Sequence, residues 1–148
     1  MYSLVLILHS LVRWVVILAA AWAIARALRG WIADRPWLPL DHRVGLVFTM
    51  AMDVQVLLGL VLVFVSPLAQ EVLGDPSGAM ASPELRFFAV EHVPLMVLAA
   101  VAAYAGSVLS RKATDDRARH RRAALAFVLS LAMVLIAVPW SRPLLRLG

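Results

Sequence analysis

The chain opens with a long apolar segment, SLVLILHSLVRWVVILAAAWAIA, which runs from Ser3 to Ala25. A helix needs about 20 residues to cross the hydrocarbon core of a bilayer, and this segment is longer than that. Its one charged residue is Arg13, and no positively charged region precedes it, as a cleaved signal peptide would require. The segment therefore predicts a retained transmembrane helix.

Three further apolar segments, 44–65, 87–109 and 123–140, are long enough to span, the last with Pro139 and Trp140 at the interface. The 148 residues are 63% hydrophobic and only 16% charged, whereas a soluble domain carries about a quarter charged residues. Short links between the first and second segments, and between the third and fourth, make them antiparallel neighbours. The sequence thus predicts an all-α, integral membrane, up-down four-helix bundle as a single domain over 1–148.

Basic residues are concentrated in two links, 26–43 and 110–122, which hold ten of the fourteen lysines and arginines. The link between the second and third segments instead carries Glu71, Asp75 and Glu84. The positive-inside rule places both basic links in the cytoplasm and both termini outside. The pI near 11.0 therefore indicates membrane orientation and not nucleic-acid binding. The absence of cysteine excludes disulfide and thiolate chemistry.

Two histidines lie at matched depth in the first and third segments. His9 lies six residues after Ser3, and His92 lies six residues after Arg86, the residues at which the two helices are expected to enter the membrane from outside. Six residues correspond to a depth of about 9 Å at the helical rise per residue. In an up-down bundle these two helices are diagonal, so both imidazoles can face one core cofactor. We predict that they are the axial ligands of one haem iron. A packed, hydrogen-bonded core role is the alternative. His42 and His120 fall in the basic links and are predicted to be non-ligands.

Four further polar residues are expected to support this site. Arg13 lies one turn below His9 on the same face, and an intramembrane arginine requires a partner. We expect an ion pair between Arg13 and Asp53, with Glu91 or a haem propionate as alternative partners of Arg13. Such an ion pair is either functional or purely structural. Gln55 is positioned to hydrogen-bond a ligand imidazole or a quinone, and Glu91 adjoins His92. Such groups orient metal ligands and tune redox potential.

The third segment also contains Pro94, which removes one backbone hydrogen bond and is expected to bend the helix around the site. Ala99 and Ala103 follow His92 at helical spacing. Small residues of this kind either leave room for a flat macrocycle or allow close helix packing.

Several motifs resemble a bacterial family of small four-helix membrane proteins commonly labelled cytochrome b or cytochrome b-like. They are HSLVRW at 9–14, RFFAVEH at 86–92 and PWSRP at 139–143, together with Gln55 and Gly59, Ser66-Pro67 and RKATD at 111–115. The resemblance spans nearly the whole chain. It implies haem b and electron transfer. The chain departs from the family pattern at Asp53 and Val63, where relatives tend to carry histidine and tyrosine.

The sequence therefore favours a b-type cytochrome in the bacterial inner membrane, an electron-transfer protein or oxidoreductase subunit that relays electrons from quinol. Two alternatives remain. One is a cofactor-free accessory subunit of a larger respiratory or photosynthetic complex or a homo-oligomer, with Arg142 and Arg146 contacting a partner. The other is a metal or proton transporter that uses His9, Asp53, Glu91 and His92.

Overall fold

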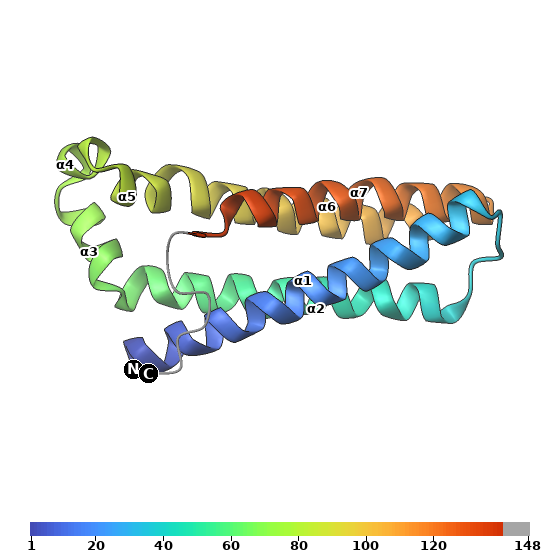
Figure 1. Ribbon diagram of the computed structural model, residues 1–148, viewed down its shortest axis with the longest axis horizontal. Coiled ribbons are helices and arrows are strands. Elements are labelled where there is room, and N and C mark those ends of the chain that lie inside the picture. Colours follow the sequence, from blue (N-terminus) through green and yellow to red (C-terminus); the bar gives the residue numbers. More distant parts are fainter. Residues whose placement is uncertain (141–148) are drawn as a thin grey trace.

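The computed structural model describes residues 1–140, and every regular element in that range is helical (Figure 1). Arg142, Arg146 and the 141–143 part of the C-terminal motif lie outside the described residues. The elements in chain order are α1 (Tyr2–Ile32), α2 (Pro39–Val65), α3 (Pro67–Gly74), α4 (Pro76–Ala81), α5 (Pro83–Arg86), the π-helical segment η1 (Phe87–His92), α6 (Val93–Arg111) and α7 (Asp116–Ala137).

Among residues 1–140, four stretches are long and apolar enough to cross a membrane: α1, α2, the continuous run from Pro83 to Arg111, and α7. The predicted all-α membrane bundle is therefore confirmed. α1 and the continuous run from Pro83 to Arg111 extend beyond their predicted apolar segments at both ends, whereas α2 starts earlier than predicted and ends at Val65 as predicted. Hydropathy marks the part of a helix that lies in the bilayer core, whereas the backbone hydrogen bonds continue into the polar boundary.

Prolines and short polar side chains set the helix boundaries. Ser66 ends α2, and the following Pro67 starts α3. The hydroxyl of Ser82 accepts a hydrogen bond from the backbone N–H of Leu85 at the start of α5. The predicted extension of the last helix to residue 140 is wrong: α7 ends at Ala137, because a proline at 139 forces the preceding residue into an extended conformation.

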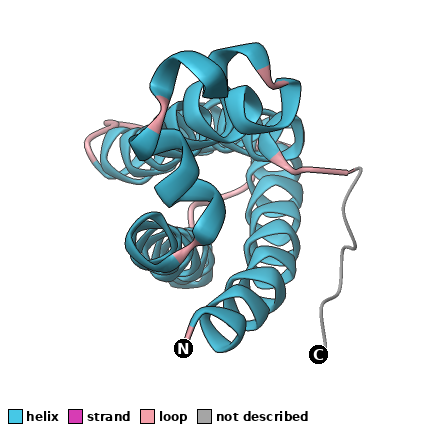
Figure 2. Cartoon of the chain, turned by 90° about the vertical axis from the view of Figure 1, so that its left-hand side faces the viewer, coloured by secondary structure: helices cyan, strands magenta, loops and turns pink. Residues whose placement is uncertain are grey.

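The packing is that of an up-down bundle, which Figure 2 shows nearly end-on. α1 packs against α2 and α7, and α6 packs against α7 and α2, so that α1 and α6 are diagonal. The links 33–38 and 112–115, which contain or adjoin most of the basic residues, lie at one end of the bundle (Figure 1). The N-terminus and α3, α4 and α5 lie at the other end, here called the N-terminal end.

The tightly packed core occupies the middle of the bundle and the end with the basic links. Phe48 and Phe127 meet edge to face with ring centroids 5.3 Å apart. Ala99 and Ala103 are fully buried in this core, and the Ser130 hydroxyl donates to the Ala99 carbonyl oxygen at 2.7 Å. These two alanines therefore serve helix packing and do not open space for a macrocycle.

Candidate functional site

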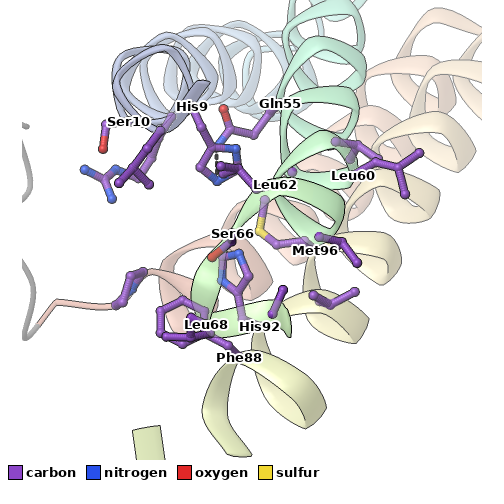
Figure 3. Close-up of a pocket in the computed structure, with 18 of the residues that line it drawn as sticks. His9, Ser10, Gln55, Leu60, Leu62, Ser66, Leu68, Phe88, His92 and Met96 are labelled. Atoms are coloured by element: carbon purple, nitrogen blue, oxygen red, sulfur yellow. Dashed lines mark hydrogen bonds between the residues drawn. The ribbon is translucent and has the colours of Figure 1, made fainter. Parts of the chain in front are cut away.

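A cavity of about 440 Å³ lies at the N-terminal end of the bundle, lined by α1, α2, α3, η1, α6 and the end of α7. Most of its wall is apolar. The polar side chains of His9, Arg13, Gln55 and His92 face it, and Figure 3 shows how three of these four lie within it. Its size and its few convergent polar groups are typical of a small-molecule or cofactor site.

The two predicted histidines meet in this cavity. The ring centroids of His9 and His92 are 6.4 Å apart, and the ring planes are inclined by 62°. Two imidazoles that each bond one metal ion at about 2 Å, the usual metal–nitrogen distance, have centroids about 6 Å apart. The diagonal placement of α1 and of the continuous helical run η1–α6 thus brings the two imidazoles together at one end of the bundle.

Each imidazole is held by one hydrogen-bonding partner. Nδ1 of His92 lies 2.7 Å from the Ala137 carbonyl oxygen; since a carbonyl only accepts, Nδ1–H is the donor and Nε2 carries the free lone pair. Nε2 of His9 lies 3.1 Å from the Gln55 amide nitrogen. A metal at His9 therefore either replaces Gln55 at Nε2 or binds at Nδ1.

Two polar atoms in the cavity are buried without a hydrogen-bond partner among the described residues. They are Nδ1 of His9 and Oε1 of Gln55. The Gln55 residue is only 3% exposed. Buried polar atoms are nearly always paired, so an exception calls for an explanation, such as a bound water or ion or a redox or catalytic role. Both orphaned atoms belong to the site predicted from sequence.

His92 is the last residue of the π-helical segment η1. Pro94, two residues further on, cannot donate to the Val90 carbonyl, so the regular helical ladder is interrupted here. Single π-helical turns inside α-helices occur frequently at functional sites. The wider turn carries Phe87 and Phe88 against the His92 ring, with centroids 6.1 and 5.5 Å away. The helix is thus interrupted by a π-helical turn just before Pro94, and the bend expected at Pro94 stays a prediction.

Arg13 and Glu91 differ in their relation to the cavity. Arg13 is 9% exposed and lines it, and its guanidinium carbon lies 5.9 Å from the centre of a Trp14 ring. Glu91 is exposed and is not part of the lining. Although it adjoins His92 in sequence, Glu91 points away because consecutive helical residues face different directions.

The expected pairing of Arg13 with Asp53 is not formed. The Asp53 carboxylate instead accepts hydrogen bonds from the Tyr104 hydroxyl, at 2.6 and 2.7 Å. The reason is helical geometry: residues two apart do not share a face. Because Gln55 faces His9, Asp53 is turned toward α6, and Tyr104 on α6 is within reach.

Two features of the structure are not evident from sequence. One is α3, which the apolar pattern did not predict; its residues Leu68, Ala69, Val72 and Leu73 line the cavity. The other is His120, expected in a basic link but found in α7 and only 1% exposed, with both ring nitrogens buried and without a hydrogen-bond partner among the described residues. Among residues 1–140, no group of three or more His, Cys, Asp or Glu side chains is arranged to hold a metal ion.

The fold and the cavity define a four-helix membrane bundle with a two-histidine cavity near one end. Compared with known family models, curated proteins and solved structures, the chain has no match. Function must therefore be inferred from the cavity itself.

Proposed function

We propose that the protein is a b-type cytochrome-like membrane protein that binds one haem b between His9 and His92. The observation that carries this proposal is the approach of the two imidazoles, whose ring centroids lie 6.4 Å apart in a cavity of about 440 Å³. The resemblance of the HSLVRW and RFFAVEH segments to small bacterial cytochrome b-like proteins agrees with it. The cytoplasmic membrane of a bacterium is the corresponding location.

The number and kind of donor groups favour haem over a bare metal ion. A zinc ion bound by protein alone uses three or four side chains, and this cavity offers two imidazoles without a carboxylate beside them. A haem macrocycle brings its own equatorial nitrogens, so that two axial histidines complete the iron's coordination. The same shortage of donors counts against transport of a metal ion.

The surrounding side chains suit the ligand role. The Ala137 carbonyl fixes the His92 ring through Nδ1 and leaves Nε2 for the iron, the arrangement that orients histidine ligands in metal sites. Gln55 holds the His9 ring. The buried cation of Arg13 offers charge compensation to an anionic group of a bound cofactor.

A bound haem b supplies a one-electron couple. With both axial positions filled by imidazole, the site suits electron relay and not oxygen binding. We propose that electrons come from membrane quinol and pass to an acceptor on the outer side, and that the protein acts as an electron-transfer protein or oxidoreductase subunit. The outer position of the cavity follows from the positive-inside orientation.

The decisive measurement is a reduced-minus-oxidised absorption spectrum of the protein purified in detergent after expression with ample haem. We expect one haem b per chain in the wild type. His9→Ala and His92→Ala should each lose most of the bound haem, because a single remaining imidazole leaves one face of the iron without its protein ligand. The matched control is His42→Ala, on α2 toward the opposite end of the bundle, which should keep full haem content.

A wild-type protein without haem would contradict the proposal and favour a cofactor-free accessory subunit. Full haem content in both alanine variants would keep the class of protein but show that other residues ligate the iron. Thermal unfolding of each variant, followed by the fluorescence of the five tryptophans, separates loss of haem from loss of fold.

A further inference from the structure

A second polar site lies on the outside of the bundle, between α2 and α6. There the Tyr104 hydroxyl donates to both oxygens of the Asp53 carboxylate, at 2.6 and 2.7 Å. Asp53 lies near the middle of α2, and Tyr104 near the middle of α6. Tyr104 is 46% exposed. Both helices are long and apolar enough to span a bilayer, and in a bilayer a pair at this position on the outside of the bundle would lie next to lipid.

A carboxylate in this position has hydrogen-bonding capacity to spare. Its two oxygens offer about four acceptor positions, and Tyr104 is the one donor bound to it among the described residues. Ionisable groups within a membrane are costly and normally pair with another polar group. An additional hydrogen-bond donor that reaches Asp53 from the lipid phase would reduce this cost.

We propose that Asp53 and Tyr104 form a bilayer-facing site for the headgroup of a hydroquinone, whose hydroxyl donates a hydrogen bond to Asp53. A hydroquinone combines what the site requires: it dissolves in the hydrocarbon region, it carries hydroxyl donors, and its flat ring can pack against the exposed Tyr104 ring. This inference rests on the proposed function, because it names where the quinol of that function binds.

The place of the pair in the fold agrees with this assignment. Asp53 and Gln55 lie in the same turn of α2 but face different ways, Gln55 toward His9 in the cavity and Asp53 toward Tyr104 on α6. The two sites are thus separated by about one helix diameter, roughly 10 Å. A quinol at Asp53 would be reached from the bilayer without entering the cavity.

The test is a calorimetric titration of the protein in lipid nanodiscs with decylubiquinol, without oxygen. We expect saturable binding to one site per chain. Asp53→Leu should weaken binding about tenfold or more, because a hydrogen bond to a charged group is removed. Tyr104→Phe keeps the ring but frees the carboxylate from its fixed orientation, so a smaller loss is expected. Trp22→Phe, a lipid-facing aromatic on α1 that is 50% exposed, should bind as the wild type does.

The ligand has its own matched control. The dimethyl ether of decylubiquinol has the same ring and tail but no hydroxyl donor. The ether should bind the wild type about tenfold more weakly than the quinol does. Its affinity for the wild type and for Asp53→Leu should be the same. Repeating the titration with His92→Ala makes the result independent of haem. Binding that persists in this variant supports the site even if the haem proposal fails.

Three results would overturn the site. One is unchanged binding by Asp53→Leu, and another is equal affinity for the quinol and its dimethyl ether. The third is evidence that a second copy of the chain, and not a quinol, covers this face. The sequence has no cysteine, so Leu57→Cys, one turn from Asp53 and 60% exposed, can report on it. Efficient disulfide dimers of Leu57→Cys in membranes, with Trp22→Cys remaining monomeric, would assign the face to a protein interface.

Discussion

At the scale of single residues, the end of the bundle with the basic links depends on one glycine. Gly30 in α1 lies directly against the buried ring of His120, and a Cβ at position 30 would overlap that ring. On its other side the His120 ring contacts Trp37, with centroids 4.8 Å apart. His120 stands in a run of arginines, RARHRR, which in sequence looks like a solvated surface. His120 is buried because α1 packs against α7, which the local sequence does not show.

We expect Gly30→Ala to destabilise the protein by about 1–3 kcal/mol, the usual cost of overpacking a filled core. Thermal unfolding in detergent would measure this. Gly74→Ala is the matched control, because no atom lies within 4 Å of its added Cβ; its effect should stay within about 0.5 kcal/mol. Combining Gly30→Ala with His120→Ala should recover part of the loss, since the overlapping ring is gone. A Gly30→Ala protein as stable as the wild type would contradict this packing.

At the scale of the elements, Asp41 joins α1 to α2. One carboxylate oxygen accepts from Arg26 Nε at 2.7 Å, and the other accepts from the backbone N–H of Leu38 at 2.8 Å, where α2 begins. Asp41 is 8% exposed. The contact thus fixes both the start of α2 and the approach of the two helices. The sequence shows an acid in the first turn of a helix but does not show which arginine it binds.

Asp41→Ala should lower the free energy of unfolding by about 2–3 kcal/mol, because two hydrogen bonds to a buried charge are lost. Asp41→Asn retains an acceptor for Leu38 and should lose less. The comparison is Asp116→Ala, which removes the more exposed pair with Arg119 at 3.2 Å; exposed pairs contribute less than about 1 kcal/mol. Equal effects of the two alanine substitutions would show that Asp41 has no special role in joining the helices.

At the scale of the whole molecule, the two ends of the bundle differ in charge. Both basic links lie at one end, and the N-terminus with α3, α4 and α5 lies at the other (Figure 1). The positive-inside rule then predicts that the basic end is cytoplasmic and that the cavity opens toward the outer side.

A membrane-impermeant maleimide can test this orientation in intact cells, because the chain has no cysteine of its own. Ser77→Cys, on α4, should be labelled without permeabilisation. Thr114→Cys, in the link before α7, should be labelled only after the membrane is opened. Both residues are exposed, so accessibility within the protein does not limit the reaction. The reverse pattern would invert the predicted topology and place the histidine cavity on the cytoplasmic side.

Most residues of the site could be predicted from the sequence, but several of their hydrogen-bond and ion-pair partners could not. Matched depth and antiparallel direction were enough to predict that His9 and His92 meet. The chemistry of the Gln55 side chain suggested a hydrogen bond to an imidazole or a quinone, and the bond to His9 is present. The expected pairing of Arg13 with Asp53 is not formed because Asp53 faces Tyr104 on α6, whereas Gln55 two residues later faces His9, and depth in the membrane does not determine this direction. Glu91 adjoins a site residue in sequence but points away from the cavity.

The sequence by itself determined the four apolar helices, their up-down order and the end at which the histidines lie. These properties depend on hydropathy, link length and charge, which act locally along the chain. Only the tertiary structure decided that α3 lines the cavity, that a π-helical turn carries His92, that Asp53 faces Tyr104 and that His120 is buried against Gly30. Each of these depends on the rotation of one helix relative to another. That rotation is set by the shapes of packed side chains, because in lipid both the inner and the outer faces of a helix are apolar.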